Sequence, residues 1–196
     1  MSFQANVPNF LTIVRFLLTF AFIFCLSRSG VAEVVLAILL FMLASWTDFF
    51  DGYYAKKHNL VSNFGKIMDP IADKFLILAA FFLFAQRYLI AYWMFYLIFA
   101  REVIVTGSRI VAIGRGQVLA AERAGKLKTI FQLFVIWLTL LFILLQENGA
   151  LAYLPPSFYH AGVFVITALM AFTVFLTVVS GVSYFWNNRD ILLSPQ

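Results

Sequence analysis

The chain has 196 residues, of which 63% are hydrophobic and only 12% are charged. Soluble domains are about 45–50% apolar and about 25% charged, so this composition excludes an ordinary soluble protein. The net charge is +5 at pH 7, and the single cysteine, Cys25, excludes a disulfide within the chain. We therefore interpret the sequence as that of an integral membrane protein.

Several apolar segments are expected to cross the membrane as helices. Some are shorter than the roughly 20 apolar residues that span the hydrocarbon, so they must include polar residues that face inward. The first segment is not expected to be a secretory signal, because no Lys or Arg precedes it and Arg15 interrupts it. The sequence predicts an all-α membrane protein, a six-transmembrane-helix bundle in which residues 1–196 form one domain. The six spans cover about residues 10–27, 33–52, 69–86, 88–110, 127–146 and 160–187.

Positive charge is distributed unequally between the two sides of this predicted bundle. Arg28 and Arg87 lie on one side, and most of the other Lys and Arg residues lie on the side that carries both termini. Because cytoplasmic loops carry the excess of Lys and Arg, we expect both termini in the cytoplasm. The pI near 9.5 then indicates loops next to anionic lipid and not nucleic-acid binding. The residues on the cytoplasmic side are Lys56, Lys57, Lys66, Lys74, Arg101, Arg109, Arg115, Arg123, Lys126, Lys128 and Arg189.

An acidic segment, DFFDGYYAKKHNLVSNFGKIMDPIAD, connects the second and third spans on this cytoplasmic side. Asp48 and Asp51 are three residues apart, and Asp69 and Asp73 are four apart. On helices both spacings place the two side chains on one face. An antiparallel hairpin of the two spans would then bring the four carboxylates to one membrane depth.

Such a carboxylate cluster needs cations. Two charges 4 Å apart interact by about 4 kcal/mol at an effective dielectric of 20. Ligands that offer only oxygen suit Mg²⁺, Mn²⁺ or Ca²⁺. The segment therefore predicts two divalent ions, and carboxylates that share metals commonly serve phosphoryl chemistry.

Helix capping is the alternative interpretation of these carboxylates. Asp69 precedes Pro70, and Asp-Pro is a common helix start. Capping explains one of the four carboxylates, but not the whole set together with Gly52 and Gly65. Gly52 lacks a Cβ atom, so a base or sugar could lie against its helix, although close helix packing is an alternative explanation.

The acidic segment resembles the signature of the CDP-alcohol phosphatidyltransferases, D-x2-D-G-x2-A-[R]-x8-G-x3-D-x3-D. One position departs, because Lys56 stands where that family usually has Arg. Lys keeps the positive charge but loses the two-pronged geometry of a guanidinium group. The positions that match are Asp48, Asp51, Gly52, Ala55, Gly65, Asp69 and Asp73.

The resemblance implies a fold, a reaction and roles for residues. It implies six transmembrane helices, a homodimer and a cytoplasm-facing active site with two Mg²⁺ or Mn²⁺ ions in a bacterial cytoplasmic membrane. An alcohol hydroxyl would attack the β-phosphorus of CDP-diacylglycerol and release CMP. Asp48, Asp51, Asp69 and Asp73 would bind the metal ions, and Asp73 would also deprotonate the hydroxyl. The residues implied to bind CDP-diacylglycerol are Asn9, Thr12, Arg15, Asp48, Gly52, Lys56 and Gly65.

Two cationic runs, AREVIVTGSR and AERAGKLKT, are expected on the same membrane face as the acidic segment. Arg and Lys at the edge of a site commonly bind phosphate, so the runs favour an anionic acceptor, although topological anchoring is an alternative. The runs, with NVPNFLTIVR and SGVSYFWNNRD, resemble the family branch that uses sn-glycerol 3-phosphate and gives phosphatidylglycerol phosphate. The residues expected to bind the acceptor phosphate are Arg101, Arg109, Lys126 and Lys128.

Other functions stay open at this point. Phosphatidylglycerol and inositol phosphate are alternative acceptors within the family. A divalent-cation transporter is an alternative of a different class, and it would carry carboxylates through the membrane depth. Glu33 and Glu147 are expected in outside loops, and the middles of the spans are expected to lack carboxylates, which disfavours transport.

Overall fold

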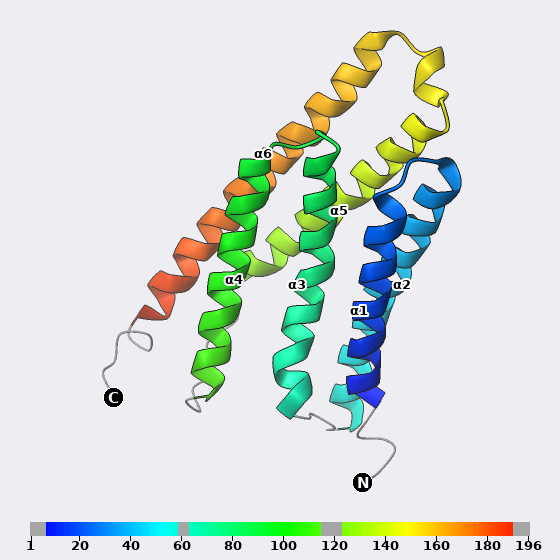
Figure 1. Ribbon diagram of the computed structural model, residues 1–196. Coiled ribbons are helices and arrows are strands. Elements are labelled where there is room, and N and C mark those ends of the chain that lie inside the picture. Colours follow the sequence, from blue (N-terminus) through cyan, green and yellow to red (C-terminus); the bar gives the residue numbers. More distant parts are fainter. Residues whose placement is uncertain (1–6, 59–62, 115–122, 190–196) are drawn as a thin grey trace.

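The computed structural model describes residues 7–58, 63–114 and 123–189, with the side chains of residues 10–47, 68, 71–112 and 127–189. Within these ranges the chain forms six α-helices and a short 3₁₀ helix, η2 (Figure 1). The helices are α1 (Val7–Leu26), α2 (Val31–His58), α3 (Asn63–Gln86), α4 (Tyr92–Gly114), α5 (Arg123–Glu147), η2 (Ala150–Tyr153) and α6 (Pro156–Asn187).

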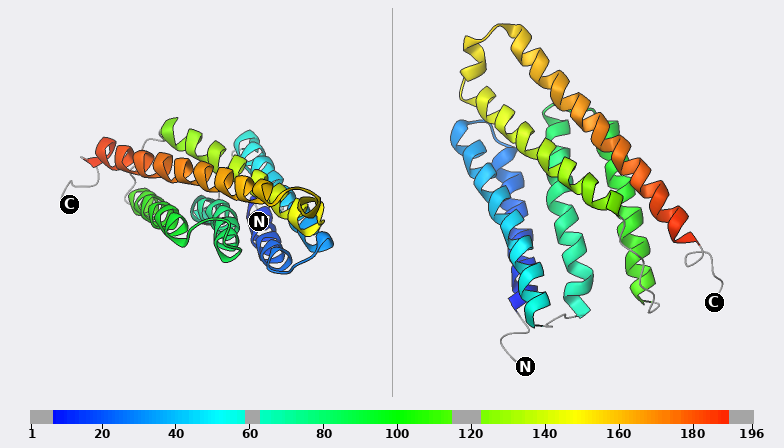
Figure 2. Two further views of the ribbon diagram at one scale, coloured as in Figure 1. Left: turned by 90° about the horizontal axis from the view of Figure 1, so that it is seen from above. Right: turned by 180° about the vertical axis from the view of Figure 1, so that it is seen from behind.

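The six helices form two layers. Helices α1, α3 and α4 stand side by side in a row, and α2, α5 and α6 lie across the other side of that row (Figure 2). Contacts between the layers join α1 to α2, α3 to α5 and α4 to α6. The start of α1 and the end of α6 lie toward the same end of the bundle (Figure 1).

The helices near the acidic segment are longer than the sequence predicted. Helix α2 continues to His58, and α3 begins at Asn63, six residues before the predicted start. Asp69 and Pro70 therefore lie inside α3, so the alternative that Asp69 caps a helix start is wrong. The predicted spans followed the apolar residues alone, whereas a helix can continue beyond the apolar region through polar residues.

The predicted start of the fourth span at residue 88 is also wrong, because a helix cap lies there. Tyr88 has a φ of 58°, a left-handed conformation that is uncommon for residues other than glycine. The Tyr88 amide donates to the Ala85 carbonyl, and the Leu89 amide donates to the Phe84 carbonyl, both at 3.0 Å. This pair of hydrogen bonds is a Schellman motif, which ends α3 and delays α4 to Tyr92.

The core lies between the two layers and is built from large apolar side chains. Phe22, Phe41, Phe81 and Phe84 are all inaccessible to solvent. Helices α5 and α6 approach closely at Gly162, where a Cβ atom would lie 2.3 Å from the Phe142 ring. A side chain at this position would force the Phe142 ring to move.

The outer surface is also strongly apolar. Large side chains such as Phe20, Phe164 and Phe175 are at least half exposed. Leu127–Glu147 and Pro156–Asn187 are long and apolar enough to cross a membrane, and Phe10–Leu26 and Val31–Thr47 are shorter apolar helices. Apolar surface on this scale marks contact with membrane or protein, so we describe the chain as a membrane protein.

Candidate active site

A partly enclosed cavity of about 160 Å³, lined by both apolar and charged side chains, lies where α1, α2, α3 and α5 meet. Arg15 enters it from α1, and its side chain is 1% exposed. Asp73 enters from α3. Arg15 therefore points into the bundle. An arginine that faces lipid would instead extend along the outside of the helix toward the membrane surface. The residues that line the cavity are Arg15, Ala44, Ser45, Asp73, Leu76, Ile77, Thr129 and Leu133.

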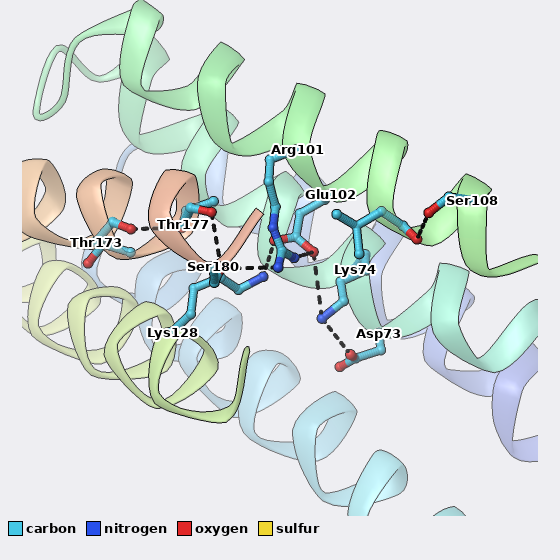
Figure 3. A network of polar contacts seen from close by, with 10 residues as sticks. Asp73, Lys74, Arg101, Glu102, Ser108, Lys128, Thr173, Thr177 and Ser180 are labelled. Atoms are coloured by element: carbon cyan, nitrogen blue, oxygen red, sulfur yellow. Dashed lines mark hydrogen bonds and ion pairs between the residues drawn. The ribbon is translucent and has the colours of Figure 1, made fainter. Parts of the chain in front are cut away.

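A cluster of charges adjoins this cavity (Figure 3). At its centre is Glu102 of α4, whose side chain is 2% exposed and accepts a hydrogen bond from the Lys128 ammonium group of α5. Arg101 Nη1 lies 3.4 Å from Glu102 Oε1. Lys74 Nζ lies 3.8 Å from Glu102 Oε2. Three cations therefore surround one buried carboxylate. The negative charge of Glu102 offsets part of the repulsion between these cations.

Lys74 connects this cluster to the cavity. Its ammonium group lies 3.3 Å from Asp73 Oδ2 as well as 3.8 Å from Glu102. Asp73 and Lys74 are neighbours on α3, so this helix places one side chain in the cavity and the next against α4. The cavity and the charge cluster are therefore linked through the contact of Lys74 with Asp73.

Helix α6 holds Arg101 from the opposite side. Arg101 Nη2 donates to Ser180 Oγ at 3.0 Å, and the Ser180 hydroxyl donates to the Thr177 carbonyl, also at 3.0 Å. Gly181 gives the arginine room, because a Cβ atom there would lie 3.1 Å from Arg101 Cγ. Arg101 Nε is buried and has no hydrogen-bond partner among the described residues. The guanidinium group is thus held at Nη1 by Glu102 and at Nη2 by Ser180.

The four aspartates predicted to bind metal are carried by neighbouring antiparallel helices (Figure 1). Asp48 lies ten residues before the end of α2, and Asp73 lies ten residues after the start of α3. Asp48 therefore lies about 15 Å from the end of α2, and Asp73 lies about 15 Å from the start of α3. Because these two helix ends are consecutive in the chain, the two residues lie at similar depth. The side chains of Asp48, Asp51 and Asp69 lie outside the described residues, so the predicted cluster is described only at Asp73. The donor set, four carboxylates without Cys or His, fits Mg²⁺ or Mn²⁺.

Comparison with known proteins identifies the family. A family model for CDP-alcohol phosphatidyltransferases matches residues 5–180. The chain belongs to this family. It is 37% identical to the CDP-diacylglycerol–glycerol-3-phosphate 3-phosphatidyltransferase of Bacillus subtilis, over 95% of this chain and 97% of that one. The enzyme of the same name from Rickettsia felis is 36% identical, over 94% of this chain and 96% of that enzyme. A probable phosphatidylglycerophosphate synthase of Mycobacterium tuberculosis is 36% identical, over 92% of this chain and 80% of that protein.

The cationic residues predicted for this CDP-alcohol phosphatidyltransferase do not all lie together. Arg101 and Lys128 both contact Glu102. Arg109 is half-buried further along α4, and among the described residues no ion pair or hydrogen bond joins it to Glu102. Thr12 is buried one turn before Arg15 on the same face of α1. The structure does not describe the surroundings of Gly52 and Gly65 or the side chains of Asn9, Lys56 and Lys126.

Glu102 and Ser180 were not among the predicted site residues, and Lys74 was predicted only as a topological charge. The expectation that the middles of the spans lack carboxylates is wrong, because Glu102 lies near the middle of α4. One available signal was a charged residue within an otherwise apolar span, which is a functional indicator in itself. Ser180 carried no such signal, because serine is common at contacts between membrane helices.

Proposed function

We propose that this CDP-alcohol phosphatidyltransferase transfers the phosphatidyl group of CDP-diacylglycerol to sn-glycerol 3-phosphate, giving phosphatidylglycerol phosphate and CMP. The observation that carries the proposal is the link from Asp73 through Lys74 to the cluster of Arg101, Lys128 and Glu102. It joins a carboxylate that can accept a proton to cations that can bind a phosphate. The enzyme names of the relatives from Bacillus subtilis and Rickettsia felis specify the same acceptor.

Asp73 is proposed as the general base. The oxygen of the acceptor hydroxyl forms a bond to the β-phosphorus, while the bond from that phosphorus to the oxygen of CMP breaks. The hydroxyl proton passes to the Asp73 carboxylate, and the electron pair of the broken bond leaves with CMP. Asp73 suits this role because its side chain lines the cavity yet keeps partial access to solvent.

Positively charged side chains are proposed to hold the two phosphate-bearing substrates. Arg15 lies in the cavity with Asp73, so it can bind the donor diphosphate next to the base. Thr12, on the same face of α1, and Asn9, Gly52, Lys56 and Gly65 complete the proposed donor site. Arg101 and Lys128 are proposed to bind the acceptor phosphate, with Arg109 and Lys126 nearby along the chain. The acceptor would then reach from this phosphate pocket to Asp73.

Two divalent cations, Mg²⁺ or Mn²⁺, are proposed to be held by Asp48, Asp51, Asp69 and Asp73. When bound, such ions neutralise the diphosphate and stabilise the charge that develops on the leaving phosphate. The matched spacing of these aspartates from the ends of α2 and α3 supports the assignment.

All six helices are proposed to cross a bacterial cytoplasmic membrane, with both termini and the active site toward the cytoplasm. The exposed apolar side chains and the uneven distribution of Lys and Arg support this topology. Residues 1–196 are proposed to form one transferase domain, consistent with the family match over residues 5–180. The family resemblance further suggests a homodimer, which cross-linking in native membranes would detect.

The decisive experiment measures CMP release by the purified protein. We expect release with CDP-diacylglycerol, sn-glycerol 3-phosphate and Mg²⁺ or Mn²⁺, and loss of release when a chelator is added. Phosphatidylglycerol and inositol phosphate are offered in parallel to identify the acceptor. The proposal fails if glycerol 3-phosphate gives no more CMP than a reaction without acceptor.

A further inference from the structure

Glu102 is the anion around which the cationic part of the site is organised. One of its oxygens, Oε1, accepts the hydrogen bond from Lys128 of α5 and lies 3.4 Å from Arg101 Nη1 of α4. Its other oxygen, Oε2, faces Lys74 of α3 at 3.8 Å. One buried carboxylate therefore contacts cations from three helices (Figure 3).

Stability alone is a weak explanation for such a carboxylate. An ionisable side chain inside a membrane helix is costly, and apolar residues of similar volume often stabilise a core as well as a buried ion pair does. Removal of the anion, however, would leave Lys74, Arg101 and Lys128 to repel one another. Glu102 thus allows the positive charge to stay concentrated at one place.

One hydrogen-bond donor of Arg101 is not used by the contacts within the cluster. Glu102 approaches Arg101 at Nη1, and Ser180 accepts a hydrogen bond from Nη2. Arg101 Nε, in contrast, is buried with no hydrogen-bond partner in the part of the chain that the structure describes. A buried donor without a partner is costly, and a phosphate oxygen is a suitable acceptor for it.

Glu102 is also connected, through Lys74, to the proposed general base, Asp73. Lys74 Nζ lies 3.8 Å from Glu102 and 3.3 Å from Asp73, so a single side chain separates the two carboxylates. An acceptor with a phosphate at one end and a reacting hydroxyl at the other must contact the cations and Asp73 at the same time. The distance between them is therefore a determinant of productive binding.

We propose that Glu102 is a positioning residue, which holds Arg101 and Lys128 at the spacing from Asp73 that a short phosphorylated alcohol requires. The inference rests on the proposed function, because it assumes that these two cations bind the acceptor phosphate. Glu102 does not itself touch the substrate; it acts through the cations.

The test compares Michaelis constants for the two substrates. Glu102→Gln keeps the size of the side chain but removes its charge, and we expect it to raise KM for glycerol 3-phosphate about tenfold or more. KM for CDP-diacylglycerol should stay within about twofold of the wild-type value. Glu102→Asp keeps the charge and should recover part of the loss. Glu147→Gln is the matched control, since it breaks a different ion pair, with Arg87, and should leave both constants unchanged.

A double variant tests whether Glu102 acts through Lys128. If it does, the acceptor KM of Glu102→Gln/Lys128→Met rises by less than the product of the two single increases. Increases that multiply would overturn the inference. So would an unchanged acceptor KM in Glu102→Gln, or a fall in kcat and melting temperature without a selective change in acceptor KM.

Two further outcomes are distinguishable. If Glu102→Gln does not fold, Glu102→Asp carries the test: a selective rise in acceptor KM supports the inference, and an unchanged value overturns it. Wild-type protein that releases no CMP with glycerol 3-phosphate overturns the proposed function itself. Normal wild-type activity together with a normal Glu102→Gln variant overturns only the role of Glu102.

Discussion

Arg15 of α1 and Asp73 of α3 line the same cavity, although they lie far apart in the sequence. Within an apolar bundle this places a guanidinium group and a carboxylate around one small space. The pairing suits a phosphorylated substrate, because a cation can hold the phosphate while the carboxylate accepts a proton. The same pairing makes separate predictions for binding and for turnover.

The first prediction concerns Asp73. Asp73→Asn keeps the shape of the side chain but removes its ability to accept a proton, so kcat should fall by about 10²–10⁴-fold. Binding of CDP-diacylglycerol, measured as a shift in melting temperature, should partly survive, because Arg15 remains in the cavity. Glu33→Gln, a carboxylate change in the first turn of α2, serves as the control. Wild-type turnover in Asp73→Asn would remove Asp73 from the chemistry.

The second prediction concerns the room that Gly181 gives to Arg101. In Gly181→Ala the new methyl group would lie 3.1 Å from Arg101 Cγ, so the guanidinium group must shift by a few tenths of an ångström. We expect KM for glycerol 3-phosphate to rise about threefold or more. Gly107→Ala is the matched control, since nothing lies within 4 Å of its added atom. Equal constants in both variants would contradict the close fit.

The third prediction concerns an ion pair at the other end of the bundle. Arg87 Nη1 lies 2.9 Å from Glu147 Oε1, and Arg87 Nη2 donates to the carbonyls of Leu26 and Arg28 at 3.0 and 2.8 Å. Glu147 Oε2 also accepts a hydrogen bond from the Gly30 amide at 3.0 Å. These contacts tie the turn after α1 to the ends of α3 and α5.

Arg87→Gln and Glu147→Gln should each destabilise the protein by about 1–3 kcal/mol, because each leaves a partly buried charge with fewer partners. Thermal unfolding in detergent measures the effect, and the double variant should lose less than the sum of the two losses. The Michaelis constants of the folded variants should not change, because Arg87 lies about 21 Å along α3 from Asp73. Additive losses would show that the pair is not coupled.

The fourth prediction concerns Gln132, which lies one turn beyond Lys128 on α5. Its side chain is inaccessible to solvent, and neither amide atom has a hydrogen-bond partner among the residues described. Burial of unpaired polar groups costs about 1–3 kcal/mol, so Gln132→Met should raise the melting temperature. Gln132→Ala, which also opens a cavity, should gain less or lose stability. A lower melting temperature in Gln132→Met would indicate that a buried water pairs with the amide.

Much of the architecture could be predicted from the sequence. Apolar segments longer than a few turns dictate helices, because lipid cannot satisfy backbone polar groups, and each predicted span overlaps an observed helix. The residues at which the helices begin and end were less predictable. Tyr88 ends α3 in a left-handed conformation, and polar residues extend α2 to His58, neither of which apolar patterning reveals.

The candidate site was predictable only in part. The spacing of Asp48, Asp51, Asp69 and Asp73 indicates which family the chain belongs to, and the family match agrees. The spacing of Arg101 and Lys128 indicates only two cations near the same membrane face. Nothing in either run shows that both contact Glu102, because the contact depends on how α4 and α5 are turned toward each other.

Composition and residue spacing are properties of the chain alone, and they are enough to indicate a helical membrane protein with a phosphotransfer signature. The sharing of one cavity by Arg15 and Asp73, and the contacts of Glu102 with Lys74, Arg101 and Lys128, are visible only in the folded chain. Helical periodicity fixes which residues share a face of one helix. Which faces meet is decided by the packing of all the helices together, through shape, charge and burial.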